Sequence, residues 1–196
     1  MARTLFVGDI HGCADELDKL LQKTSPTRVI LTGDLFTRGP DPRGVWKLIK
    51  RWGAEAVMGN HDAWVLDNWR PGKQLSGKAL RWLSERPHLL HGQGWTAVHA
   101  GIDPTRNPKR TRRRHALHVR RWPDDSRSSN PHWWRLWRGK RLIVHGHDNK
   151  NGLIDRRPHS LGLDTGCVKG GHLSGYLLER DRIVRVRARK DYTTRC

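Results

Sequence analysis

Asp, Asn and His side chains recur in this sequence beside glycine, directly after short apolar stretches. Five such strings occur, at G-D-I-H-G (8–12), G-D-L-F-T-R-G-P (33–40), G-N-H-D (59–62), V-H-A-G (98–101) and V-H-G-H (144–147). Glycine permits unusual backbone angles and a close approach of the chain, which suits tight turns. Any one string would pass for an ordinary turn, but packing alone gives no reason to end five apolar stretches in this way. The set therefore predicts a metal site.

Carboxylate, amide oxygen and imidazole are together the ligands of hard to intermediate divalent cations, and the strings contain no thiolate among these ligands. We expect two ions, with Mn²⁺ as the first choice and Fe²⁺, Zn²⁺, Co²⁺ or Ni²⁺ as alternatives. Two ions about 3.5–4 Å apart clamp the attacking and departing oxygens of an in-line displacement, and they need a shared carboxylate. Asp34 is the natural bridge, because it lies in the second of the first three strings.

The elements that position these side chains follow from hydrophobic periodicity. The first part of the chain predicts strands at 3–7, 28–32 and 55–58, and helices at 13–23, 43–52, about 61–69 and 76–85. The second part predicts strands at 95–99, 141–145, 160–164, 173–178 and 182–188. Open α/β sheets bind their ligands just beyond the carboxyl ends of the strands, which is where the strings fall.

A basic segment separates the two parts. Residues 104–132 are rich in Arg and Pro, and we predict one domain over 1–196 with a basic loop or short cap at about 104–139. This segment leaves the strand that ends at His99 and therefore begins near the metal site. Arg112, Arg113 and Arg114 are candidates for holding the distal phosphates of a polyphosphate substrate. A solvated, mobile loop is the alternative.

The net charge of +19 would attract nucleotides, polyphosphates, nucleic acid or an anionic membrane surface. An Arg-rich composition that spreads solvated charge over the surface would give the same value. The three cysteines, Cys13, Cys167 and Cys196, show no short pair spacing and favour neither a disulfide framework nor a Cys-based zinc site. Because no signal-peptide pattern and no long apolar stretch occur, we expect a soluble cytoplasmic protein that does not contact membranes.

The order of the strings resembles that of the calcineurin-like metallophosphoesterase superfamily. L-D-T-G-C-V-K-G-G-H-L at 163–173 is similar to the closing signature of one branch, which holds the phosphoprotein phosphatases and the symmetrical bis(5'-nucleosyl)-tetraphosphatases that hydrolyse diadenosine tetraphosphate. The resemblance covers about 1–101 and 140–178. It implies an α/β fold, in which two mixed sheets flanked by helices form an α-β-β-α sandwich.

Matched position by position, the family pattern implies roles for individual residues. The implied metal ligands are Asp9 and His11 for the first ion, Asp34 as the bridge, and Asn60, His99 and His147 for the second ion. The resemblance makes His61 the general acid that protonates the leaving oxygen. It makes Arg38 the clamp on the phosphoryl group, with Asn60 beside it at the substrate. His145 ranks below His147 as a ligand, and strand-end packing or a supporting role fits it better.

Position 37 separates the candidate functions. Phosphoprotein phosphatases carry Asp-Arg-Gly where this chain has Thr37-Arg38-Gly39, and that Asp orients the general acid. A small residue there resembles the tetraphosphatases, since ADP leaves more easily than a serine alkoxide and needs less proton donation. We therefore predict a two-metal phosphohydrolase that cleaves dinucleoside polyphosphates such as diadenosine tetraphosphate symmetrically to two ADP, by attack of a metal-bridging hydroxide.

Two alternatives stay open at this point. A protein serine/threonine phosphatase would use the same core, and the short span between His99 and His147 would leave its site open to a phosphoprotein. A non-catalytic nucleic-acid-binding protein would account for the charge and the interleaved aromatic residues. The intact set of metal ligands argues against this second alternative.

Overall fold

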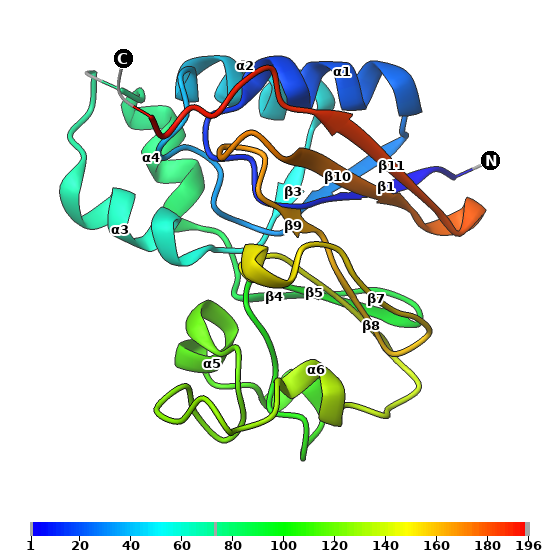
Figure 1. The fold of residues 1–196 in the computed structure, drawn as a ribbon. Helices are drawn as coiled ribbons and strands as arrows, with labels where there is room; N and C mark the ends of the chain where they lie inside the picture. Colours follow the sequence, from blue (N-terminus) through cyan, green and yellow to red (C-terminus); the bar gives the residue numbers. More distant parts are fainter. Residues whose placement is uncertain (1, 73, 195–196) are drawn as a thin grey trace.

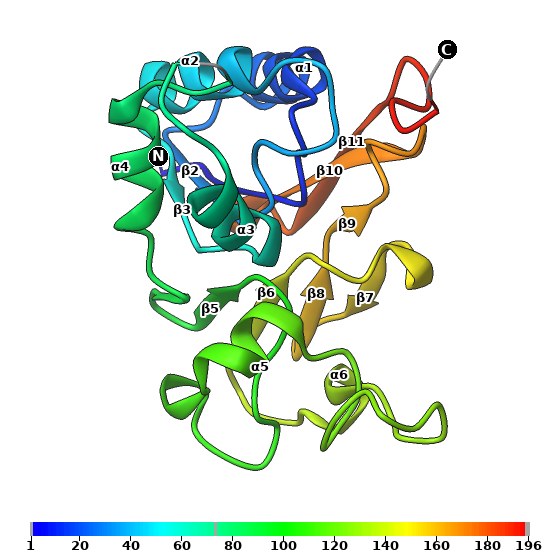
Figure 2. The ribbon, with the colours of Figure 1, turned by 90° about the vertical axis from the view of Figure 1, so that its left-hand side faces the viewer.

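Two β-sheets lie face to face in the computed structural model, which describes residues 2–72 and 74–194. Helices α1 and α2 cover the outer face of one sheet, and α5 and α6 lie outside the other (Figure 1; Figure 2 shows the same layers from the side). This arrangement confirms the predicted α-β-β-α sandwich of two mixed sheets. No helix in the described part of the chain has the length and apolar character needed to cross a membrane.

The helices and strands alternate through the first part of the chain, and strands dominate the second. The helices are α1 (Ala14–Thr24), α2 (Pro42–Trp52), α3 (Asn60–Asn68), α4 (Gly77–Ser84), α5 (Arg113–His118) and α6 (Trp133–Leu136), with 3-10 turns at Pro108–Arg110, Asn149–Asn151 and Leu178–Arg180. The strands are β1 (Thr4–Val7), β2 (Arg28–Leu31), β3 (Glu55–Ala56), β4 (Leu89–His91), β5 (Trp95–Val98), β6 (Leu142–His145), β7 (Ile154–Arg156), β8 (Ser160–Gly162), β9 (Asp164–Thr165), β10 (His172–Leu177) and β11 (Arg182–Arg187).

The order of the strands brings the five strings together. The first sheet runs β11-β10-β1-β2-β3, with β9 also paired to β10, and β1, β2 and β3 are parallel. The second sheet runs β4-β5-β6-β8-β7, and β5, β6 and β8 are parallel. The strings follow the carboxyl ends of β1, β2, β3, β5 and β6. Parallel strands end at a common edge, so each sheet presents its ligands along one edge.

Two features of the strands differ from the prediction. Strands β4 and β7 were not predicted, because three residues are too few to establish an alternating pattern. The predicted strand at 160–164 is two strands in different sheets: β8 pairs with β6, whereas β9 pairs with β10. Leu163, between them, is buried in the core between the two sheets, and Asp164 thereby enters the first sheet.

The apolar core has three layers. Beneath α1 and α2, the inward faces of both helices pack on the first sheet through residues such as Leu17 and Ile49. Between the sheets, the rings of Phe6 and Trp95 meet edge to face, with their centroids 4.9 Å apart. The third layer joins the second sheet to α5 and α6. The two sheets are thus held together by an aromatic centre, and the ligand-bearing edges are fixed against each other.

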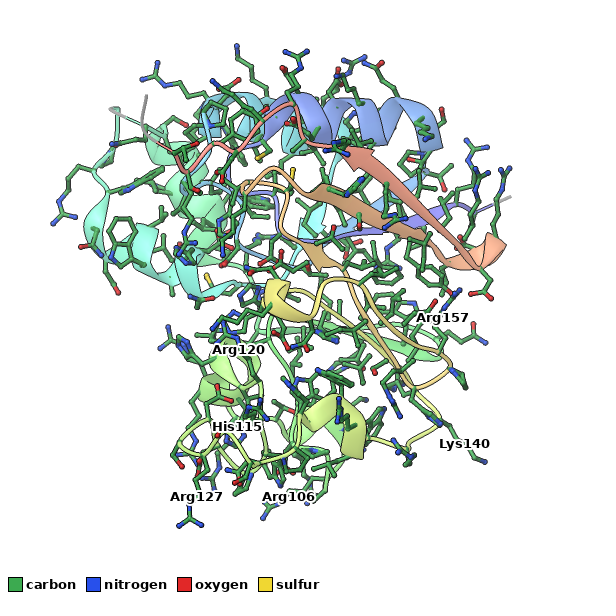
Figure 3. The ribbon with its side chains drawn as sticks, in the orientation of Figure 1. Arg106, His115, Arg120, Arg127, Lys140 and Arg157 are labelled. Atoms are coloured by element: carbon green, nitrogen blue, oxygen red, sulfur yellow. The ribbon has the colours of Figure 1, made fainter. Side chains whose placement is uncertain are left out.

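The basic segment packs on the second sheet. Trp133 of α6 is 1% exposed, its Nε1 donates a hydrogen bond to the carbonyl of Ala100 at 3.1 Å, and its ring centroid lies 4.9 Å from that of His145. Charged side chains of the segment point outward, and Arg106 and Arg127 lie at its far end (Figure 3). Trp133 therefore anchors the segment next to the string at 98–101, and Trp134 and Trp137 are buried in the same layer of the core.

Trp133→Ala should lower the free energy of unfolding by about 3–5 kcal/mol, because it removes a fully buried aromatic side chain and leaves a cavity. Leu136→Ala is the matched control on the same helix, since Leu136 is 41% exposed, and it should cost about 0.5 kcal/mol or less. Urea unfolding of the three proteins measures both changes. Equal losses in the two variants would contradict the anchoring role of Trp133.

Candidate metal centre

A cavity of about 190 Å³ opens where the carboxyl ends of the two sheets meet. Its lining contains Asp9, His11, Asp34, Arg38, Asn60, His61 and His147, together with Arg120, Asn149, Lys150, Asp164 and Lys169. His99 lies behind this lining, fully buried, with its Nε2 2.8 Å from Oδ1 of Asn60. The structure thus brings together all six side chains predicted to bind metal, and the two predicted to act on the substrate.

Asp34 stands at the centre of the cavity floor. Its Oδ2 lies 3.6 Å from Nε2 of His11, and its Oδ1 lies 3.5 Å from Nε2 of His99. Ligand atoms of Asp9, Asp34 and His99 all lie within 4.8 Å of one another. Asp34 therefore faces ligands of both predicted ions, one with each oxygen, which is the position that a bridging carboxylate needs.

Three acceptors converge beside Asp34 with no donor between them. The Nδ1 of His99 donates to the carbonyl of Thr32 at 2.9 Å, and the Nε2 of His147 donates to the carbonyl of His118 at 3.2 Å. Each ring therefore turns its free lone pair towards Oδ1 of Asn60, at 2.8 Å from His99 and 3.0 Å from His147. A divalent cation satisfies such a group of lone pairs, so these three residues fit the second ion.

The pKa values of the carboxyl groups in the cavity also favour a cation site. Burial, then the neighbouring carboxyls of Asp164 and Asp34, raises the pKa of Asp9 well above its usual value. Burial also raises the pKa of Asp34 to about 7 and raises the pKa of Asp164. Crowded buried carboxylates hold protons unless a cation neutralises them. The donor set and its charge therefore fit two divalent ions.

The histidines of the cavity are neutral, as metal ligands must be. Burial lowers the pKa of His11 well below its usual value, and nearby His61 and Arg38 lower it further. Burial lowers the pKa of His99 to about 4 and depresses that of His147 further still. Each imidazole thus keeps a lone pair for a cation at neutral pH.

Thr37 contacts His11, a predicted metal ligand. The hydroxyl of Thr37 lies 3.0 Å from Nδ1 of His11, which fixes the ring so that Nε2 faces Asp34. The Asp of the phosphoprotein phosphatases at position 37 orients the general acid, and the sequence predicted that Thr37 does not take this role. In the structure, the ring of His61 contacts Arg38 instead, with 3.0 Å between its Nε2 and a guanidinium nitrogen of Arg38.

Burial, then the guanidinium of Arg38, lowers the pKa of His61 to about 4. The ring is therefore neutral at pH 7 in the absence of an anion. Arg38 itself is exposed at the mouth of the cavity, where a phosphoryl group can reach it. A phosphate dianion between the two side chains would offset the effect of Arg38 on His61 and favour the protonated ring.

Asp62 is a buried carboxylate that sequence reasoning did not assign to the site. It is fully buried and accepts hydrogen bonds from the backbone N–H groups of Asp34 at 2.8 Å, Leu35 at 2.9 Å and Gly59 at 3.0 Å. The N–H of His61 in turn donates to Oδ1 of Asp34 at 2.8 Å. These hydrogen bonds hold the first turn of α3 against the loop after β2. In the sequence, the signal for this role was Asp62 itself, the last residue of the string G-N-H-D.

Asp164 is the second residue that was missed. It lines the cavity beside Asp9, at the first position of β9. The signature at 163–173 contains Asp164. Its place in the cavity could not be predicted, because it depends on the chain crossing from β8 in one sheet to β9 in the other.

The backbone of the site is held in costly conformations. His11, Asp34, Arg38 and His147 have φ angles of 47°, 55°, 68° and 67°, in the left-handed region that non-glycine residues avoid. Each such residue costs about 1–3 kcal/mol and persists only where the surroundings impose it. A Cβ on Gly146 would overlap Oδ1 of Asp9, so the turn before His147 needs glycine for close approach. Such strain at candidate ligands is typical of functional sites.

His145 does not line the cavity. It is fully buried, contacts Trp133, and its Nδ1 lies 3.2 Å from the carbonyl of Gly146. Strand alternation would have put His145 and His147 on one side, but β6 ends at His145 and the left-handed turn at His147 redirects the chain. The strand-end packing role is therefore the one that His145 has.

The basic segment contributes Arg120 to the cavity. Its guanidinium is 3.5 Å from the carbonyl of His147 and lowers the pKa of Asp34 against the effect of burial. Figure 3 shows Arg120 on the side of the segment nearer to the sheets. Arg112, Arg113 and Arg114 are exposed and do not line the cavity, so their proposed role in substrate binding stays a prediction.

Comparison with known proteins agrees with this geometry. The family model described as calcineurin-like phosphoesterase matches residues 2–184. A symmetrical bis(5'-nucleosyl)-tetraphosphatase from Mannheimia succiniciproducens is 35% identical over 123 residues, which are 52% of this chain and 45% of the relative. The protein of the same name from Dechloromonas aromatica is 28% identical over 263 aligned positions, covering 93% of this chain and 95% of the relative.

Length distinguishes this chain from these relatives. The chain spans about half the length of the first relative, since the alignment covers 45% of that protein. The alignment with the second relative has 263 positions, which is more than the 196 residues of this chain. The second relative therefore has positions within the aligned region that have no counterpart in this chain.

Solved structures include one of similar size. The crystal structure of a candidate diadenosine tetraphosphatase superposes with a TM-score of 0.87 at 31% identity, covering 95% of this chain and 94% of the other. A serine/threonine phosphatase from Saccharomyces cerevisiae has a TM-score of 0.61 at 13% identity, covering 95% of this chain and 79% of the other. The second likeness extends to the fold alone.

Addition of Mn²⁺ should raise the melting temperature, and the rise should be larger at pH 8 than at pH 5.5. The pKa of Asp34 in the metal-free fold is about 7, above its usual 3.8, so a proton competes with the metal below pH 7 and metal affinity grows as pH rises through this window. Differential scanning fluorimetry measures the shift, and Asp34→Asn, which should show a much smaller one, is the control. Equal shifts at the two pH values would contradict this account.

Thr37→Val should weaken Mn²⁺ binding about 10–100-fold, because it removes the hydroxyl that orients the His11 ring and keeps the shape of the side chain. Thr37→Ser retains the hydroxyl and should stay close to the wild type. Titration calorimetry with Mn²⁺ separates them. If the Val and Ser variants bind Mn²⁺ equally well, Thr37 does not orient a metal ligand.

Proposed function

This chain belongs to the calcineurin-like phosphoesterase family, and we propose that it hydrolyses dinucleoside polyphosphates such as diadenosine tetraphosphate symmetrically to two ADP. The observation that supports this choice most is the environment of His61. Its ring contacts Arg38, and the residue at position 37, Thr37, contacts His11 instead. A weakly assisted acid suits a leaving group such as ADP better than a serine alkoxide. A cytoplasmic location, expected from the sequence, remains part of this proposal.

The metals belong to this proposal as well, with Mn²⁺ as the first choice. Asp9 and His11 would hold one ion, Asn60, His99 and His147 the other, and Asp34 would bridge them. When bound, the two ions polarise the phosphoryl oxygens and provide a nucleophile from water at neutral pH. The protein supplies a rigid donor set, because the rings of His11, His99 and His147 are each held by a hydrogen bond at the ring nitrogen that does not face the predicted metal site.

Positive side chains would bind and orient the phosphate chain. Arg38, at the mouth of the cavity, can grip two oxygens of the phosphoryl group that is attacked. Arg120, Lys150 and Lys169 line other parts of the same cavity and can neutralise the neighbouring phosphates. A chain of several phosphates therefore matches this cavity better than a single phosphomonoester would.

His61 would assist the departure of the leaving oxygen. Its ring is half-buried at the edge of the cavity, and its centroid lies 5.1 Å from that of His11. Once Arg38 has bound the phosphoryl group, the anion raises the pKa of His61 from about 4, and the ring can carry the proton that the leaving oxygen takes.

The purified protein with Mn²⁺, and separately with Co²⁺, should convert diadenosine tetraphosphate to ADP as the only nucleotide product, as resolved by chromatography. Asp34→Asn should lose at least about 10³-fold of this activity, because the residue that faces both sets of ligands is neutralised. Release of phosphate from a phosphoserine peptide, with the dinucleotide left intact, would instead assign the protein to the phosphatases. Retained nucleic-acid binding without either activity would favour the non-catalytic alternative.

A further inference from the structure

A second hollow, of about 680 Å³, adjoins the metal cavity. The two share Arg38, Asn60 and His61, so a ligand that occupies one can extend into the other. A volume of this size is in the range of small-molecule sites. The hollow lies on the side of His61, where the proposed reaction releases its leaving group.

The walls of the hollow away from the metals are aromatic and come mainly from α3. Trp64 is 50% exposed, and the described residues contain one other exposed large apolar side chain, Leu136 at 41%. The indole of Trp69, just after α3, lines the same hollow and packs partly against the core. A half-exposed indole beside a reaction centre is costly in water and suited to stacking on a flat ligand.

Three residues that line the hollow lie in one row along α3. His61, Trp64 and Asp67 follow one another at intervals of three residues, so they form one row on the helix surface. The row runs from the proposed proton donor, across the indole, to a carboxylate. His118, at the end of α5, lies across from it in the lining of the hollow.

Asp67 indicates which part of a nucleotide fits here. The metal cavity is lined by four basic side chains and by carboxyl groups that metal ions would neutralise. The hollow is lined by Arg38, where it joins the cavity, and by the carboxylate of Asp67 farther along α3, in a protein of net charge +19. A carboxylate repels phosphate and accepts hydrogen bonds from amino groups. The phosphates therefore belong beside the basic residues, and a flat group with an amino substituent belongs beside Trp64.

We propose that this hollow binds the nucleobase of the nucleotide that leaves, with the base stacked on Trp64 and its exocyclic amino group donating to Asp67. The inference rests on the proposed nucleotide hydrolase function and adds a specificity site to it. Trp64 and Asp67 act by positioning and selecting the nucleotide, and His61 at the head of the row donates a proton to the leaving oxygen.

The test measures binding of ADP and of pyrophosphate to the Mn²⁺-loaded protein by titration calorimetry. Base–aromatic stacking predicts that Trp64→Ala raises the Kd of ADP about tenfold and leaves the Kd of pyrophosphate within about twofold. Trp64→Phe keeps an aromatic surface and should retain most of the affinity for ADP. Leu136→Ala removes the other exposed apolar side chain, far from the hollow, and should change neither value.

Asp67→Ala provides an independent variant. The wild type should bind ADP more tightly than IDP, because hypoxanthine keeps the purine ring but carries a carbonyl in place of the exocyclic amino group, and the variant should lose this preference. Equal effects of Trp64→Ala on ADP and pyrophosphate, or an unchanged ADP affinity, would overturn the base site. Trp64-dependent binding of a phosphoserine peptide, with no effect on ADP, would also overturn it.

These outcomes are separable from the fate of the proposed function, because product binding needs no turnover. Trp64-dependent binding of ADP without cleavage of diadenosine tetraphosphate would keep the base site and reject the proposed reaction. Cleavage of the dinucleotide with ADP affinity insensitive to Trp64 would keep the reaction and reject the base site.

Discussion

Three buried carboxyl groups share one cavity with a set of unpaired hydrogen-bond acceptors, and the rest of the structure holds them there. Asp9, Asp34 and Asp164 crowd one cavity with their pKa values raised, and the lone pairs of His99 and His147 meet the amide oxygen of Asn60 without a donor between them. Such an arrangement is unfavourable by itself, since buried acceptors and charges require partners. Divalent cations, which membership of the calcineurin-like phosphoesterase family implies, would neutralise these carboxyl groups and provide a partner for these lone pairs.

The rest of the fold follows from holding that arrangement in place. The two sheets are fixed to each other by an aromatic core, which aligns the carboxyl ends of β1, β2 and β3 with those of β5 and β6. Left-handed turns then aim His11, Asp34 and His147 into the cavity, and Asp62 ties the loop after β2 to the start of α3. Because α3 begins at the predicted metal site, the same helix that supplies Asn60 and His61 also carries the row of Trp64 and Asp67 that leads away from this site.

Most of the strands, helices and cavity residues could be predicted from the sequence, because the patterns that mark them are local. Apolar stretches that end in Gly-flanked Asp, Asn and His predicted the residues that the structure brings together in the cavity, even after β3, which is only two residues long. Asp62, Asp164 and Arg120 gain their roles from neighbours distant in sequence, in one case through a chain that crosses from β8 to β9, and local patterns do not contain that information. Periodicity likewise fails at His147, because the left-handed turn after β6 breaks the alternation.

A crystal structure grown with Mn²⁺ would show whether Asp34 bridges two ions, through the anomalous scattering of the metal. Asp34 faces His11 with one oxygen and His99 with the other, so the account predicts two anomalous peaks, one on each side of its carboxylate. The second peak should lie among Asn60, His99 and His147, where the three acceptors converge. A single peak that leaves these three side chains in contact with one another, or metal bound elsewhere, would contradict it.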